Sequence, residues 1–132
     1  MVPVFPDAEA LTLGFLRQHL SHDVQFGTYV PGSYDGARPL VIVRRIGGHM
    51  RWPALDIATL DVESWAASRE TAHDLAQEVT AALMATRTTG GPFARVNVIA
   101  GLTFMVDDLT ELSRWITTFQ ISTRPRGSEH GA

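Results

Sequence analysis

The sequence predicts an α+β fold, in which two helices pack on one face of a largely antiparallel mixed sheet of about five strands. Stretches with strand-like alternation of apolar and polar side chains are interrupted by two stretches with helical spacing of apolar residues. The expected order is helix, three strands, helix, two strands. A chain of 132 residues has the length of one domain, which we expect at residues 1–123.

The centre of this prediction is a strand at residues 55–66 that leads directly into a long helix. Its expected core face carries Ala58, Leu60, Val62 and Ala66, whereas Thr59, Asp61 and Glu63 face the other way. Ser68 is the expected helix cap. Beyond it, one helical stripe is formed by Ala72, Leu75, Ala76, Val79, Ala82 and Leu83. The helix should end in the polar and glycine-rich residues 88–92.

The elements before this unit are less regular. Asp7 is expected to cap a first helix that ends near Leu20. Strands are predicted at residues 24–30 and 40–46, with Arg44 and Arg45 on opposite faces of the second. Glycine and proline place loops at residues 31–39 and 47–53, which we expect to be poorly ordered in the free subunit.

The last part of the chain predicts an antiparallel hairpin with strands at residues 95–106 and 112–123, joined by a turn at residues 107–110. Gly101 is expected to mark a bulge. Residues with core-facing parity in the final strand are Trp115, Thr117, Phe119 and Ile121. Residues 124–132 contain no large apolar side chain and are expected to be a disordered tail.

Composition limits the possible functions. The chain has no cysteine, which excludes disulfides, thiolate metal sites and a cysteine nucleophile. Its formal net charge of −3 argues against a general nucleic-acid binder. No secretory signal and no apolar run of membrane-spanning length is visible, so we expect neither export nor a membrane partner.

The sequence offers little for catalysis. Asp61 and Glu63 share a strand face and could form an acid–base or metal pair, but no nucleophile, phosphate loop or zinc spacing accompanies them. We interpret them as solvated or interfacial charges. His19 and His22 lack a third ligand at fixed spacing. We therefore expect no catalytic residues, no cofactor and no metal.

A partner surface is the stronger prediction. The two loops carry Tyr34, Arg38, Arg51 and Trp52, residue types that dominate binding hot spots, although Trp52 could instead fold back on the core. The outer sheet face carries the apolar residues Ile57, Trp65, Ile99, Met105 and Ile116 among Asp61, Glu63, Arg95 and Arg114. Such a face indicates self-association or docking, unless loops cover it. The predicted interface set is Tyr34, Arg38, Arg44, Arg51, Trp52, Asp61, Glu63 and Trp65.

The strand–helix passage from Leu60 to Ala76, LDVESWAASRETAHDLA, resembles the tail terminator proteins of siphoviruses, which are long-tailed bacteriophages. The resemblance extends to the first helix, the strand and turn VIVRRIGG and the closing strands. It implies a structural protein of the virion neck, without enzyme activity, that forms a homohexameric ring on the head-proximal end of the tail tube. The ring stops tube polymerisation and offers a surface for head joining.

The partners implied by the resemblance are other copies of the chain, the major tail tube protein and a head-completion or connector protein. DNA would pass through the lumen without sequence-specific binding, and assembly would take place in the host cytoplasm. Two alternatives stay open at this point. The chain could be another head–tail connector protein, or a small enzyme, ligand-binding or regulatory domain that uses the outer sheet face.

Overall fold

The computed structural model describes residues 2–108 and 110–127 and has the predicted α+β order. Its elements are α1 (Ala8–His19), β1 (Gln25–Gly27), β2 (Leu40–Arg51), β3 (Leu55–Ala66), α2 (Arg69–Thr89), β4 (Arg95–Val106) and β5 (Ser113–Thr123). The strands form one sheet in the order β1-β2-β3-β5-β4. Every neighbouring pair is antiparallel except β1 and β2, which are parallel.

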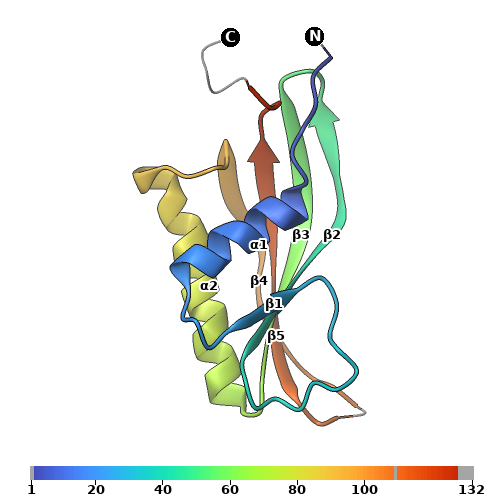
Figure 1. Ribbon diagram of the computed structural model, residues 1–132, viewed down its shortest axis with the longest axis vertical. Helices are drawn as coiled ribbons and strands as arrows, with labels where there is room; N and C mark the ends of the chain where they lie inside the picture. Colours follow the sequence, from blue (N-terminus) through green and yellow to red (C-terminus); the bar gives the residue numbers. More distant parts are fainter. Residues whose placement is uncertain (1, 109, 128–132) are drawn as a thin grey trace.

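The long strands run along the longest axis of the molecule, with α2 lengthwise beside them and α1 crossing them (Figure 1). The predicted core face of β3 is confirmed, because Ala58, Leu60 and Val62 are buried in one cluster with residues of both helices. In β5, Phe119 and Ile121 belong to this cluster. The helices and the sheet therefore share one main apolar core, in which burial supplies most of the favourable free energy of folding.

Both helix starts are set by local chemistry that the sequence predicts. The Asp7 carboxylate accepts hydrogen bonds from the backbone amides of Glu9 and Ala10. The Ser68 hydroxyl accepts one from the Thr71 amide, 3.1 Å away. Each cap satisfies amides that have no partner inside the helix. The two predicted caps are confirmed.

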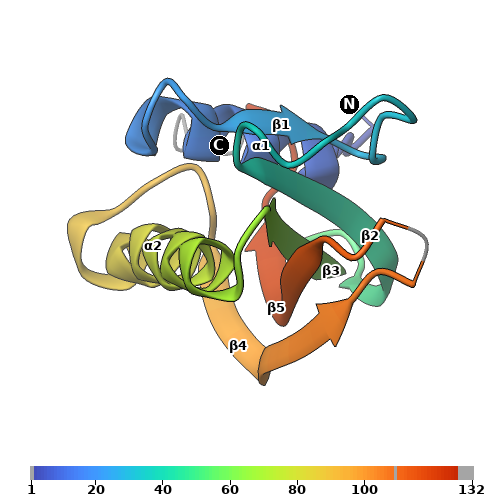
Figure 2. The ribbon, with the colours of Figure 1, turned by 90° about the horizontal axis from the view of Figure 1, so that it is seen from below.

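The β4–β5 hairpin is also confirmed, and β4 is irregular at two places. Register shifts lie between Val98 and Ala100 and between Ala100 and Thr103. The second contains Gly101, where a bulge was expected. The strand is bent as a result, which is visible in the view along the sheet (Figure 2).

Two predictions for the early strands are wrong. The strand expected at residues 24–30 is the three-residue β1, which pairs with Leu40, Val41 and Ile42 of β2. The loop expected at residues 47–53 is mostly strand, because β2 continues to Arg51 opposite Leu55. Ile46 is an extra residue in the ladder, since Arg45 pairs with Leu60 and Gly47 with Thr59. Pairing with β3 outweighs the weak strand propensity of the two glycines.

Gly48 makes this continuation possible. Its φ is 129°, a conformation that L side chains rarely adopt, and a Cβ built there would collide with the carbonyl oxygen of Ile57 on β3. Gly48→Ala should therefore destabilise the protein by about 2 kcal/mol or more. Urea denaturation would measure it. Gly47→Ala is the matched control, because its Cβ would meet nothing within 4 Å. Equal losses in the two variants would contradict this explanation.

The predicted disordered tail falls partly outside the described residues, at 128–132. Residues 124–127 form neither helix nor strand. The Arg126 amide donates a hydrogen bond to the carbonyl oxygen of Val4, 2.7 Å away. The two terminal segments therefore lie side by side at the end of the sheet where the β2–β3 hairpin turns (Figure 1).

Candidate functional site

Glu63 is the centre of a charged cluster on the outer face of the sheet. Its carboxylate lies 3.1 Å from Nη2 of Arg44 on β2 and 3.5 Å from Nη1 of Arg114 on β5. It also accepts a hydrogen bond of 3.0 Å from the indole Nε1 of Trp65. Only 5% of Glu63 is exposed. Of the two interpretations, a solvated charge is therefore wrong for Glu63, because cross-strand neighbours surround it, whereas its role at an interface stays a prediction.

Asp61 shares this face and has a different partner. Its Oδ1 accepts a hydrogen bond of 2.6 Å from the Thr118 hydroxyl, and Asp61 stands opposite Arg44 in the ladder. Each carboxylate is thus held by neighbouring strands, and within residues 2–108 and 110–127 neither forms a hydrogen bond or ion pair with a serine, a cysteine or a histidine. The arrangement stabilises the sheet and offers no acid–base pair.

Trp65 is buried on the outer face, so its predicted exposure is wrong. It is 4% exposed and packs with Leu40 and Ile42, and with the half-buried Val30, Tyr34 and Leu112. The Arg114 guanidinium lies 5.1 Å from the centre of its ring. The segment around residues 30–34 and the turn before β5 therefore cover this region of the outer face, which is the alternative that alternation alone left open.

The remaining apolar residues of the outer face differ in their exposure to solvent. Ile57 is buried and Ile116 is half-buried, whereas Ile99 and Met105 are exposed on the edge strand β4. Arg95 is exposed at the start of the same strand. The continuous apolar face predicted from alternation is therefore reduced to the β4 edge.

Tyr34 and Arg38 hold the loop at residues 31–39 to the rest of the chain. The Tyr34 hydroxyl lies 2.7 Å from the carbonyl oxygen of Arg38 and 3.3 Å from that of Trp65. The Arg38 guanidinium donates to the carbonyl oxygens of Asp23 and His22, at 3.0 and 3.3 Å. These contacts are internal to the subunit, so both side chains have roles that need no partner.

Burial, with a smaller contribution from the Asp35 carboxylate, raises the pKa of Tyr34 from 10.0 to about 12. A folded pKa above the unfolded one means that this contribution to stability is complete below pH 10 and is lost as the pH rises toward 12. We expect thermal stability to fall across this interval. We also expect the phenolate absorbance of the wild type minus that of Tyr34→Phe to titrate near the upper value. A difference signal at an ordinary tyrosine pKa would contradict this placement of Tyr34.

Arg51 and Trp52 lie at the tip of the β2–β3 hairpin, at the other end of the sheet. Trp52 is 62% exposed, and its ring contacts that of Phe5 with the centroids 6.3 Å apart. The alternative that Trp52 folds back on the core is therefore wrong. The structure divides the eight predicted interface residues into two groups. Arg51 and Trp52 project from the hairpin tip, and the other six belong to the outer face and the loop that borders it.

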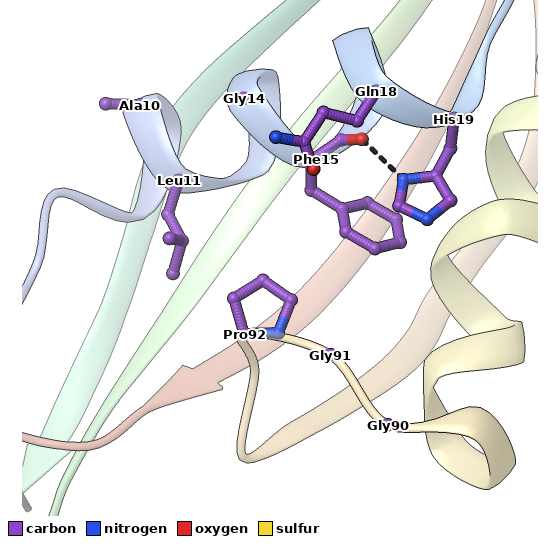
Figure 3. A pocket seen from close by; sticks show the side chains of 9 residues that line it. All are labelled: Ala10, Leu11, Gly14, Phe15, Gln18, His19, Gly90, Gly91 and Pro92. Atoms are coloured by element: carbon purple, nitrogen blue, oxygen red, sulfur yellow. Dashed lines mark hydrogen bonds between the residues drawn. The ribbon is translucent and has the colours of Figure 1, made fainter. Parts of the chain in front are cut away.

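A pocket of about 500 Å³ lies between α1 and the loop at residues 90–92 (Figure 3). Phe15 and His19 form part of its wall, with their rings stacked at a centroid distance of 4.1 Å. The only acid–base group in the lining is His19, whose Nδ1 is 2.8 Å from the carbonyl oxygen of Phe15. The pocket therefore lacks the convergent polar groups of a catalytic site.

Metal binding and membrane insertion are two further possibilities for function. Within residues 2–108 and 110–127, no group of three or more His, Cys, Asp or Glu side chains could hold a metal ion. Neither helix in the same part of the chain combines the length and apolarity that crossing a membrane requires.

Sequence reasoning also missed the ion pair between Arg45 and Asp56. Arg45 binds Asp56 with both terminal nitrogens, at 2.7 and 2.8 Å, and Asp56 is 2% exposed. This hydrogen bonding raises the pKa of Arg45, and the Arg45 amide also donates to the Glu9 carboxylate at 2.7 Å. The pair fastens α1 and β3 to β2. In the sequence, this pair is indicated by the opposite charges of Arg45 and Asp56. The pairing could be recognised only once the β2–β3 hairpin, which brings the two residues together, was known.

Comparison with known proteins identifies a family for this chain but no curated relative. A search of curated proteins finds no match to this chain. Residues 4–124 match the family described as phage tail termination protein, and this range contains both helices and all five strands. Members of this family are structural proteins of the phage tail, and such a protein acts through contacts with other virion proteins. The chain therefore belongs to the phage tail termination protein family.

Proposed function

We propose that this protein caps the head-proximal end of a siphovirus tail tube as a hexameric ring, stops polymerisation of the tube and offers the surface that joins the filled head. The observation that carries the proposal is the family match across residues 4–124, which leaves no helix or strand of the described chain outside the matched range. The proposed partners are other copies of the chain, the major tail tube protein and a head-completion protein. DNA passes through the lumen without sequence-specific binding, and the ring assembles in the host cytoplasm.

The surface supports a protein that works by assembly. Exposed large apolar residues gather at the β2–β3 hairpin tip and the adjoining N-terminal segment, namely Val2, Val4, Met50 and Trp52. Arg51 lies among them and is exposed. A tryptophan and an arginine within an apolar patch are typical of the centre of a binding surface. We therefore assign Arg51 and Trp52 to an assembly contact.

Negative-stain electron microscopy tests the proposal. The purified protein is imaged alone and after mixing with its tail tube protein, and we expect six-fold rings or tubes with a ring at one end. Tubes that elongate at the same rate with and without the protein would overturn it. Rings that bind the head-completion protein but never a tube would instead indicate another head–tail connector.

Trp52→Ala and Arg51→Ala should each weaken assembly by about 1–3 kcal/mol per interface. Because the contact is repeated around a closed ring, these losses should abolish capping while circular dichroism shows an unchanged fold. Tyr29→Ala is the matched control, since Tyr29 is an aromatic residue that is 72% exposed and distant in sequence from the tip. If both tip variants cap tails at normal length, the hairpin tip is not an assembly contact.

A further inference from the structure

The two ends of the molecule's long axis carry opposite charge. At one end, β2 and β5 finish and β3 and β4 begin, since Asp56 pairs with Thr123 and Arg95 with Ser122. We call it the hairpin end. At the other, β4 finishes and β5 begins, since Val106 pairs with Ser113. We call this the turn end. Figure 1 shows them at the top and bottom of the molecule.

The hairpin end is basic and apolar. Its exposed arginines are Arg51, Arg87, Arg95, Arg124 and Arg126, and none forms a salt bridge within the described chain. Asp56 does not offset them, because it is buried and paired with Arg45. Asp7 and Glu9 lie near that pair and reduce the positive charge of this end, but the five arginines outnumber them. The apolar patch of Val2, Val4, Met50 and Trp52 lies at the same end. The surface therefore combines unpaired positive charge with apolar area.

The turn end is acidic. Its carboxylates are Asp35 in the loop before β2, Glu70 and Asp74 at the start of α2, and Asp107, Asp108 and Glu111 in the β4–β5 turn. Arg69 and Arg38 are also at this end and reduce its negative charge, but the six carboxylates outnumber them. Arg69 lies over the rings of Phe104 and Trp115, and Arg38 binds two backbone carbonyls. Met105 and Val106 add exposed apolar side chains.

We propose that the hairpin end of one subunit docks on the turn end of the next copy of this chain, and that this head-to-tail contact closes the ring. The inference rests on the proposed ring. A ring of more than two identical subunits needs two different surfaces on each subunit that fit one another. This chain carries two such surfaces, with opposite charge and with apolar residues on both. Opposite potentials favour this pairing and disfavour contacts between like ends.

Charge reversal at each end tests the contact. Arg124→Glu with Arg126→Glu reverses exposed charges of the hairpin end, and Asp108→Arg with Glu111→Arg reverses those of the turn end. We expect each double variant to need at least ten-fold more protein than the wild type to form rings, as measured by native mass spectrometry. Glu78→Arg, on the exposed middle of α2, is the matched control and should assemble normally. Circular dichroism checks that all variants fold.

Mixing the two double variants, and combining their four changes in one chain, tests directly whether the two ends bind each other. An equal mixture of the two double variants should form rings again, with the variants alternating in a one-to-one ratio. The variant with all four changes should form rings with itself and should not mix with the wild type. Loss of mixing without loss of self-assembly is expected only if the two ends bind each other.

The outcomes separate this inference from the proposed function. If the wild type forms no ring, alone or on tubes, the proposed function fails. If the wild type and both double variants form rings at the same concentration, the ring stands and the head-to-tail contact is overturned. The contact is also overturned if the hairpin-end variant forms normal rings that no longer bind tubes, because that end then faces the tube.

Discussion

Val62→Asp is expected to unfold the protein. Val62 is 1% exposed and lies between Val43 of β2 and Thr117 of β5 in the middle of the sheet, on the face that the helices cover. A carboxylate there would lose its hydration and would find no cation, because its surroundings are the main apolar core. The cost should be about 4 kcal/mol or more, a large part of the stability of a small domain. Thermal unfolding followed by circular dichroism would measure it.

The neighbouring position provides the control for Val62→Asp. Asp61→Asn changes the opposite face of β3 and keeps the oxygen that accepts the Thr118 hydroxyl, so its cost should stay below about 1 kcal/mol. Leu75→Asp on the buried side of α2 should be as damaging as Val62→Asp. Similar melting temperatures for all three variants would mean that the assigned faces of β3 and α2 are wrong.

Glu63→Ala is expected to be the most destabilising removal of a charged side chain from the outer face, at about 3 kcal/mol. It would leave the indole N–H of Trp65 without its acceptor and remove the anion that lies between Arg44 and Arg114. Glu63→Gln should be milder, because an amide oxygen can still accept from the indole. Urea denaturation followed by tryptophan fluorescence measures both variants.

Arg44→Ala shows how much of the stability loss in Glu63→Ala comes from the buried carboxylate and how much from an ordinary surface ion pair. The Arg44 side chain is 47% exposed, so water screens its pairing with Glu63, and its loss should cost no more than about 1 kcal/mol. A Glu63→Ala variant no less stable than Arg44→Ala would show that Glu63 contributes only as a surface charge.

The sequence by itself determined the features that depend on neighbours along the chain. The alternation in β3 and β5 identified their core faces, since side-chain direction in a strand has a period of two. Asp7 and Ser68 marked the starts of α1 and α2, because a capping side chain binds amides only two or three residues ahead. These signals were enough for the order of elements and the fold class.

Only the tertiary structure decided what covers the outer face and which charges are paired. Alternation placed Trp65 and Glu63 on that face, but it carries no information about the loop at residues 31–39, β2 or β5, which bury and pair them. Gly47 and Gly48 indicated a loop, yet a strand forms there because β3 offers a matching ladder and Gly48 accepts a left-handed φ. The opposite charges of the two ends likewise come from segments distant in sequence. Burial and charge pairing depend on such contacts, and the alternation of a single strand does not contain them.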